Sequence, residues 1–233
     1  MRKKMKVLNS IICIMVIVTC FITGCKKDGY FVGGTLHDAK VNLTTYDFLK
    51  NNDRGLFDTL IMLIDKAGIK EKINASNTTF FAPTDYAINN YVEFRTLKEQ
   101  EIDPTKKWTV DSIIKYELTR FADSLDIYRI PQTLDYGDLT QNGKLYSTAR
   151  HDAEAVVSYE RTNDPALGYN PGSSNWPQVV IFTYLFQPIS EPFVAEEIPT
   201  SVGARTIVQT SGVESLTGRV NVLTNQHTLF FAR

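Results

Sequence analysis

The 233-residue sequence has few residues that could crosslink it or catalyse a reaction. Its three cysteines, Cys13, Cys20 and Cys25, all lie in the first 25 positions. The chain beyond Cys25 therefore cannot form an internal disulfide, and its stability must come from an apolar core. A hydrophobic content of 43%, with 13 Phe and 11 Tyr residues, is sufficient to build one.

Histidine is equally scarce, since only His37, His151 and His227 are present and they lie far apart in the sequence. The sequence also lacks Gly-x-Ser-x-Gly, His-Glu-x-x-His and a glycine-rich phosphate loop, which position a nucleophile, a zinc ion or a nucleotide. We expect these histidines to be exposed or to serve packing. The sequence thus predicts no catalytic residues, no metal site and no cofactor.

Basic residues are concentrated at the N-terminus, before a long apolar run over residues 7–22. This order is typical of a secretory signal peptide. The next residues, Ile22-Thr23-Gly24-Cys25, resemble the lipobox of bacterial lipoproteins, which implies cleavage before Cys25 and a lipid on its thiol. The alternative is an uncleaved transmembrane anchor, because the apolar run is close to the minimum length of a span.

The lipobox divides the chain into a signal peptide (1–24), a lipidated tether (25–43) and a domain (44–233). The two or three acyl chains of a lipoprotein would anchor it stably to a membrane. Cleavage would leave 21 basic and 26 acidic residues, a net charge of −5, which argues against nucleic acid as a partner. We expect a lipid-anchored protein of the bacterial cell envelope, in the outer membrane, facing the periplasm or the outside.

From residue 44 onward the sequence carries helical and strand patterns in turn. The pattern predicts helices at 44–49, 56–68, 84–91 and 110–121 and a strand at 77–82. It also predicts a hairpin at Asn142-Gly143 and strands at 179–186, 205–209, 219–223 and 228–231. No internal repeat is present, so we expect one α+β domain.

A polar stretch over residues 150–177 interrupts these patterns and is predicted to be a long loop insertion, a kind of segment that often carries function. It contains Tyr159, Tyr169 and Trp176 among asparagine and aspartate residues. Aromatic faces beside amides and carboxylates are typical of surfaces that bind sugar rings or proteins. These three residues are the candidate ligand-binding residues, with the alternative that Trp176 folds back as a plug on the core.

Two segments resemble the motifs of the fasciclin (FAS1) domain family. Residues 79–88, which read TFFAPTDYAI, are similar to its first motif, and residues 211–223 are similar to its second. The resemblance implies a wedge or sandwich of β-sheet flanked by several short helices. Within the first motif we expect Phe80 and Phe81 in the core, with Thr84-Asp85 capping the next helix.

The resemblance implies a non-catalytic binding or adhesion protein of the cell surface, with a glycan or a protein as ligand. Bacterial fasciclin-like lipoproteins also suggest an accessory role beside an envelope nutrient-uptake complex. The sequence departs from the family at Glu117 and Asn221, where histidine is common, so the integrin partner of animal members is not transferred. The alternative is an envelope hydrolase acting on glycan or peptide.

Overall fold

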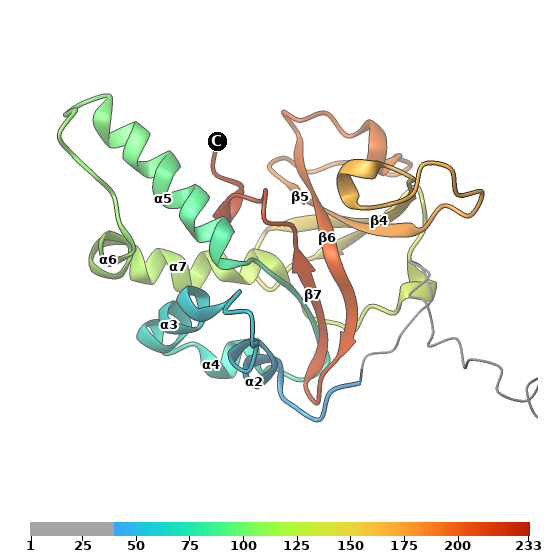
Figure 1. The fold of residues 1–233 in the computed structure, drawn as a ribbon, viewed down its shortest axis with the longest axis horizontal. Coiled ribbons are helices and arrows are strands. Elements are labelled where there is room, and N and C mark those ends of the chain that lie inside the picture. Colours follow the sequence, from blue (N-terminus) through green and yellow to red (C-terminus); the bar gives the residue numbers. More distant parts are fainter. Residues whose placement is uncertain (1–39) are drawn as a thin grey trace, which may run out of the picture. The chain divides into compact units, whose positions relative to one another are not determined.

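A seven-stranded mixed sheet organises residues 40–233, the part of the chain that the structure, a computed structural model, describes (Figure 1). The order across the sheet is β2-β1-β7-β6-β5-β4-β3, with β1 parallel to β7 and all other neighbours antiparallel. The strands are β1 (Thr78–Ala82), β2 (Arg129–Ile130), β3 (Lys144–Ser147), β4 (Glu154–Arg161), β5 (Gln178–Leu185), β6 (Gly203–Glu214) and β7 (Gly218–Leu223). The predicted signal peptide and Cys25 lie outside the described residues.

Short helices precede and follow β1 in the sequence, and α3 packs against both α5 and α7. They are α2 (Thr45–Lys50), α3 (Asp58–Ala67), α4 (Lys70–Ile73), α5 (Asp85–Gln100), α6 (Val110–Ser112) and α7 (Leu118–Ser124). Helix α3 ends because Gly68 adopts a left-handed conformation, at φ 67°, that a side chain would disfavour. Helices and sheet together confirm the predicted α+β class.

The core lies between these helices and one face of the sheet. Phe81 of β1 is fully buried and its ring lies 4.4 Å from that of Phe182 in β5. Phe80 is equally buried, at 1% exposure. Both phenylalanines of the first motif therefore serve the core, as the sequence predicted. On the other face of the sheet, a smaller apolar cluster joins Val156 and Leu185 to Ala195 and Ile198.

The domain starts before residue 44. The N–H of Val41 donates to the carbonyl of Glu214 at 2.8 Å, and the side chain of Lys40 pairs with the Glu214 carboxylate at 3.3 Å. The carbonyl of Leu43 accepts the N–H of Leu216. Residues 40–43, predicted to belong to the tether, therefore pack alongside the end of β6.

The predicted insertion at 150–177 is shorter than expected, because residues Glu154–Arg161 form β4. This strand pairs along its length with β5, and its residues Ala155 to Ser158 are buried. The strand was not predicted because its ends, Glu154 and Glu160-Arg161, are polar and its apolar centre is short. The loop proper covers residues 162–177 and connects two paired strands.

Two predicted strand features are wrong. No strand precedes Asn142-Gly143, because residues Tyr136–Asp138 form a 3-10 turn, η3, and the hairpin joins β3 to β4 over residues 148–153 instead. The segment 228–231 is not a strand, since Leu229–Phe231 form another 3-10 turn, η6. Its Phe230 and Phe231 have positive φ angles, and the Tyr128 hydroxyl accepts the Phe230 N–H at 2.7 Å.

Two helices differ in detail from the prediction. Helix α5 continues to Gln100, nine residues beyond the predicted end, and its second half projects from the body of the domain in Figure 1. The predicted helix at 110–121 is present, but Ile113–Glu117 form a π-helical turn, η1, between α6 and α7. Within residues 40–233, no helix has the length and apolar character needed to cross a bilayer.

Candidate ligand-binding surface

Two tyrosine rings lie stacked at the side of the sheet where β4 meets β5. Tyr159 lies in β4, paired with Val180 of β5, and Tyr136 begins η3. Their ring centroids are 6.5 Å apart and their planes differ by 20°. The residue before Tyr136, Asp135, is ion-paired with Arg219 of β7. Tyr159 is therefore positioned by a strand, and the residue before Tyr136 is tied to another strand.

The Tyr136 hydroxyl is also influenced by the loop that follows β4. Burial, together with the phenols of Tyr159 and Tyr169, raises the pKa of Tyr136 to about 12, against the opposing effect of the Arg161 guanidinium. At neutral pH Tyr136 therefore remains a neutral phenol that can donate a hydrogen bond. We call Tyr136, Tyr159 and Tyr169 the aromatic surface.

The loop that carries Tyr169 is tied together by its own polar side chains. The Asp164 carboxylate accepts the Ala166 N–H at 2.9 Å and starts the short 3-10 turn Pro165–Leu167. The Asn170 side chain accepts the Gly172 N–H at 2.9 Å. These are local turn contacts of the kind that asparagine and aspartate favour. The loop is therefore shaped without a large apolar core of its own.

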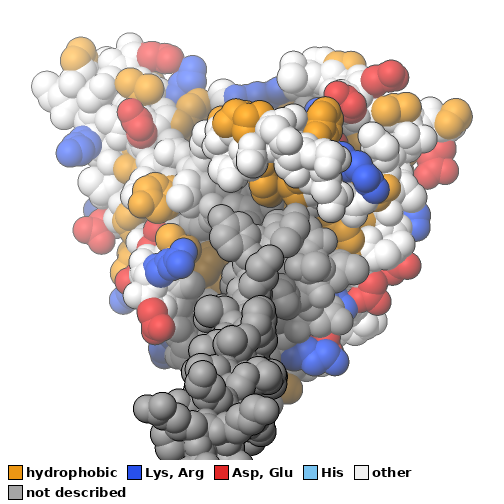
Figure 2. Space-filling model, turned by 45° about the vertical axis from the view of Figure 1, so that its right-hand side comes forward, with side chains coloured by type: hydrophobic (Ala, Val, Ile, Leu, Met, Phe, Trp, Pro, Cys, Tyr) orange, Lys and Arg blue, Asp and Glu red, His pale blue; other side chains and the backbone are white. Residues whose placement is uncertain are grey.

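Trp176 lies at the base of the same loop, where the Pro177 carbonyl accepts the Thr162 N–H at 3.1 Å. Its side chain is 47% exposed. The alternative that Trp176 plugs the core is therefore wrong. Figure 2 turns the right-hand side of Figure 1 forward and shows orange hydrophobic side chains among white backbone and other side chains on that face.

A small cavity of about 20 Å³ lies against Tyr136. Its other lining residues are Phe81, Leu134, Leu139, Val157, Val180, Gly212 and Asn221. A space of this size has room for one water molecule but not for a ligand. Any ligand of the aromatic surface must therefore lie on the tyrosine rings and not beneath them.

Comparison with known proteins identifies the scaffold of this surface. The family model of the fasciclin domain matches residues 55–164. The chain contains a fasciclin domain. Domains of this family are generally adhesion or binding modules and not enzymes.

Among solved structures, the chain is similar to a FAS1 domain pair from the insect cell adhesion molecule Fasciclin I, at 12% identity and a TM-score of 0.44. The match covers 78% of this chain and 47% of that chain, so this protein spans about half the length of the structure it matches. No curated protein matches the sequence.

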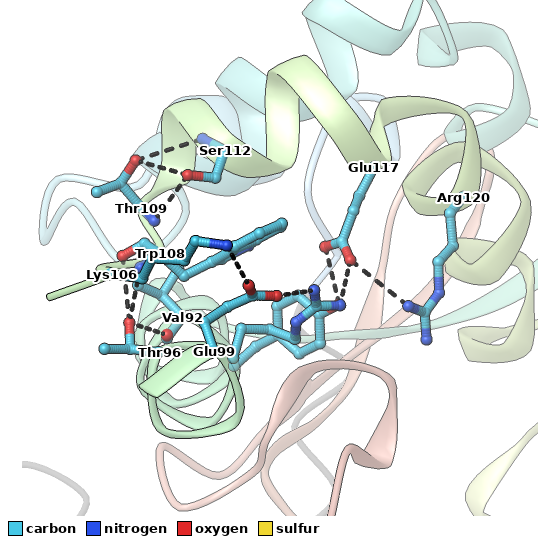
Figure 3. A network of polar contacts seen from close by, with 11 residues as sticks. Val92, Thr96, Glu99, Lys106, Trp108, Thr109, Ser112, Glu117 and Arg120 are labelled. Atoms are coloured by element: carbon cyan, nitrogen blue, oxygen red, sulfur yellow. Dashed lines mark hydrogen bonds and ion pairs between the residues drawn. The ribbon is translucent and has the colours of Figure 1, made fainter. Parts of the chain in front are cut away.

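In this fasciclin domain, Glu117 occupies the position where the family often has histidine, and it is the centre of a polar network (Figure 3). Its carboxylate accepts the Tyr91 hydroxyl at 2.9 Å and an Arg95 N–H at 2.5 Å. Arg120 lies 3.6 Å away. The Arg95 guanidinium also pairs with Glu99 and covers the Trp108 ring at 4.3 Å. Glu117 thus joins the projecting half of α5 to η1 and α7.

Asn221, the second departure, supports an irregular part of the fasciclin sheet. Its side-chain oxygen accepts the Gly212 N–H at 2.8 Å. Gly212 has a φ of 75° and lies where the pairing of β6 with β7 shifts register. A short amide that accepts one hydrogen bond satisfies the N–H that the bulge leaves unpaired. Its role is therefore structural.

Of the two histidines that the structure describes, one is exposed and the other is packed in the interior. His151 is 92% exposed and pairs with Asp152, which is 84% exposed. His227 is buried, its Nε2 lies 2.7 Å from the Tyr128 hydroxyl, and burial lowers its pKa to about 3. Neither lies beside a serine or cysteine nucleophile in the described contacts. His37 lies outside the described residues.

Sequence reasoning named Tyr159 and Tyr169, and the structure stacks Tyr159 on Tyr136, which it had not named. Tyr159 proved to be a strand residue and not a loop residue. Tyr136 lies in Asp135-Tyr136-Gly137-Asp138, which has no strand or helix period and stands 23 positions before Tyr159. Only the spacing of aromatic residues around the sheet could have indicated it.

Proposed function

We propose that this protein is a non-catalytic binding protein of the bacterial cell envelope that holds a glycan or protein ligand on its aromatic surface. The stacked pair of Tyr136 and Tyr159 is the observation that carries the proposal, and Tyr169 lies in the loop that follows β4. Flat aromatic faces with hydroxyl groups at their edges combine apolar contact with hydrogen bonding. Because Tyr159 is held on a strand and stacks on Tyr136, little side-chain entropy of this pair is lost when a ligand binds.

The loop over residues 162–177 supports this assignment. Binding residues are often found on loops held by a rigid scaffold, and this loop is fixed at its base by the β4–β5 pairing. Trp176, exposed at that base, supplies a further large aromatic side chain. Tryptophan and tyrosine are the residues most enriched among the energetically dominant contacts of interfaces.

The compartment and anchor complete the proposal. Lipid on Cys25 would hold the domain at the outer membrane, facing the periplasm or the outside, with a tether of roughly 15 residues in between. From there it could serve as an accessory of an envelope nutrient-uptake complex. Support for the anchor comes from the sequence Ile22-Thr23-Gly24-Cys25.

The test compares binding of the full-length protein, in detergent, to arrayed envelope polysaccharides and extracellular-matrix proteins. The variant Tyr169→Ala/Trp176→Ala removes two loop aromatics. The control Tyr86→Ala/Tyr116→Ala removes two tyrosines that are 51% and 65% exposed outside this surface. We expect the loop variant to bind at least about tenfold more weakly, since removal of anchor residues commonly costs 1–2 kcal/mol or more each, and the control to bind normally.

Equal binding of the loop variant and the unmodified protein would move the site elsewhere. The same polysaccharides, incubated with the protein and assayed for new reducing ends, test the hydrolase alternative. Chain cleavage by the purified protein would overturn the non-catalytic assignment. Circular dichroism of each variant establishes that a loss of binding does not come from a loss of fold.

A further inference from the structure

Two adjoining cavities form a groove along α7, away from the aromatic surface residues. The first has a volume of about 430 Å³ and is lined by Thr119, Arg120, Asp123, Ser124, Ile127, Arg150, Tyr184 and Phe230. The second, of about 360 Å³, is lined by Tyr91, Phe94, Arg95, Lys98, Arg120, Ala232 and Arg233. Arg120 lines both cavities, so they meet at its side chain. We call them together the α7 groove.

The α7 groove is basic although the domain around it is acidic. Residues 40–233 contain 19 basic and 24 acidic residues. The groove lining includes Arg95, Lys98, Arg120 and Arg150 but a single carboxylate side chain, that of Asp123. This count leaves out Arg233, which is the last residue of the sequence. Such a local excess of positive charge attracts anionic ligands.

The two arginines of the larger cavity are not used up by internal ion pairs. The Arg120 side chain is 58% exposed and lies 3.6 Å from Glu117, whose carboxylate already accepts hydrogen bonds from Tyr91 and Arg95. Arg150 is exposed on the turn between β3 and β4, and it forms no ion pair with another residue of 40–233. Their guanidinium groups can therefore turn to a ligand.

In the smaller cavity one cation, Arg95, is held tightly and the other, Lys98, is not. The Arg95 guanidinium is held by ion pairs with Glu117 and Glu99 and by its contact with the Trp108 ring. Figure 3 shows the polar network that contains these three partners. Lys98 is about half exposed and pairs with Glu101 at 3.1 Å on the surface of α5. Exposed pairs of this kind are weak and exchange readily with an anionic ligand.

The remaining lining of the larger cavity suits a sugar. Thr119 and Ser124 present hydroxyl groups, and Asp123 can accept hydrogen bonds from ligand hydroxyls. Half-buried Tyr184 and Phe230 add aromatic surface. A volume of about 430 Å³ falls in the range of small-molecule sites. A sugar that carries both hydroxyls and an acid group can pair its acid group with the arginines and donate its hydroxyls to the Asp123 carboxylate, whereas acidic side chains have no hydroxyls to donate.

We propose that the α7 groove binds an acidic oligosaccharide, one whose sugar units carry carboxylate or sulfate groups. One acidic unit occupies the larger cavity and pairs with Arg120 and Arg150, because a guanidinium group can bind two oxygens of one oxyanion with two parallel hydrogen bonds. The chain then passes Arg120 toward Arg95 and Lys98, where the next acidic group lies. This site shares no residue with the aromatic surface, so it stands or fails independently of the proposed function.

Fluorescence anisotropy of the full-length protein in detergent tests the proposal with four labelled probes. Polygalacturonate carries carboxylates, dextran sulfate carries sulfates, dextran is neutral, and poly-glutamate is an acidic polypeptide. We expect one or both acidic polysaccharides to bind in low salt, with affinity that falls as salt rises, and the neutral dextran not to bind. The difference between polygalacturonate and dextran sulfate identifies which acid group the groove prefers.

Two variants with equal charge change assign the binding to the groove. Arg120→Gln/Arg150→Gln removes the two arginines of the larger cavity, and we expect it to bind the acidic polysaccharide at least about tenfold more weakly. Lys107→Gln/Lys144→Gln removes two exposed lysines outside the groove and should change the affinity less than about threefold. Thr119→Glu keeps both arginines, adds a carboxylate to the lining of the larger cavity and should also weaken binding. This variant carries the test if the arginine variant does not fold.

Several results would overturn the proposal. Binding of neither acidic polysaccharide would reject the ligand class, and equal binding of poly-glutamate would assign the groove to acidic proteins instead. An equal loss in the arginine and lysine variants would show attraction to the whole surface and not to the groove. Undiminished binding by both Arg120→Gln/Arg150→Gln and Thr119→Glu would place the ligand elsewhere.

Discussion

The carboxylate of Asp85 accepts the backbone N–H of Thr59 at 2.8 Å, although the two residues belong to different helices. Its second oxygen accepts the Leu60 N–H at 3.0 Å. Asp85 begins α5, but its carboxylate accepts N–H groups from the first turn of α3. The N-cap residue of α3 itself makes no side-chain hydrogen bond to these N–H groups. The prediction that Thr84-Asp85 caps α5 is therefore wrong, because Asp85 links α5 to α3. The Thr84 hydroxyl donates to the Asn225 side chain and not to the backbone of α5.

The substitution Asp85→Ala should lower the free energy of unfolding by about 1–2 kcal/mol, because both N–H groups of α3 lose their acceptor. Asp85→Asn keeps one acceptor oxygen and should cost less. Urea denaturation of the full-length protein measures both. Asp58→Asn, at the exposed start of α3, serves as the control and should change the stability by less than about 0.5 kcal/mol.

The pH dependence of the Asp85 variants has a definite sign. Burial raises the pKa of the Asp85 carboxyl above its ordinary value, against the lowering effect of the two N–H donors. A group whose pKa is higher in the folded chain stabilises the fold at low pH and loses that contribution as the pH rises through the folded value. The stability of the unmodified protein relative to Asp85→Asn should therefore fall as the pH rises from about 3 toward neutral. A rise over that range would contradict the assignment.

Truncation of Phe81 tests the core assignment of the first motif. Phe81 has no exposed surface and its ring lies 4.4 Å from Phe182. Phe81→Ala should lower the unfolding free energy by about 3–5 kcal/mol, since it removes buried surface and leaves a cavity. Tyr86→Ala, five residues later at 51% exposure, should have a much smaller effect. Retention of the denaturation midpoint by Phe81→Ala would show that the ring does not carry this part of the core.

The elements that the sequence predicted well are those in which local pattern and burial agree. Helix α3 has its apolar residues on one side and Gly68 at its end, and β5 is a run of β-branched and aromatic residues. The errors came where a distant residue decides the conformation. Phe230 looks like a strand residue, yet the hydroxyl of Tyr128, 102 positions earlier, accepts its N–H and stabilises a turn.

The candidate sites were less predictable than the fold for the same reason. Tyr169 and Trp176 could be named because both lie in one polar loop. Tyr136 and the cations of the α7 groove come from separate elements: Arg95 from α5, Arg120 from α7 and Arg150 from the β3–β4 turn. Their proximity results from strand pairing and helix packing, which no single segment of sequence encodes.

The lipid anchor remains a prediction that biochemistry can test directly. Cys25→Ala removes the thiol that would carry the lipid, while Cys20→Ala, five residues earlier in the apolar run, keeps it. In cells fed labelled palmitate, we expect label in the unmodified chain and in Cys20→Ala but not in Cys25→Ala. The Cys25→Ala chain should also run as the longer, uncleaved precursor. Normal labelling of Cys25→Ala would exclude this anchor.

The buried His227 should make the domain sensitive to moderate acid. Its Nε2 lies 2.7 Å from the Tyr128 hydroxyl, its ring packs edge-on against Phe231 at 4.5 Å, and burial lowers its pKa to about 3. A base whose pKa is lower in the folded chain must gain a proton on unfolding at intermediate pH. The fold therefore loses stability as the pH falls from about 6.5 toward 3, by at most about 1.4 kcal/mol per pH unit from this one group.

His227→Gln should flatten that dependence, because glutamine does not titrate, although its loss of ring packing lowers the stability at neutral pH. His151→Gln is the matched control, since the His151 side chain is 92% exposed and its removal should leave the pH profile unchanged. Unfolding free energies from urea titrations at pH 4, 5, 6 and 7 provide the comparison. If the unmodified protein and His227→Gln gave parallel profiles, the pKa of His227 would have to be the same in the folded and unfolded chain, and the buried neutral pair with Tyr128 would be wrong.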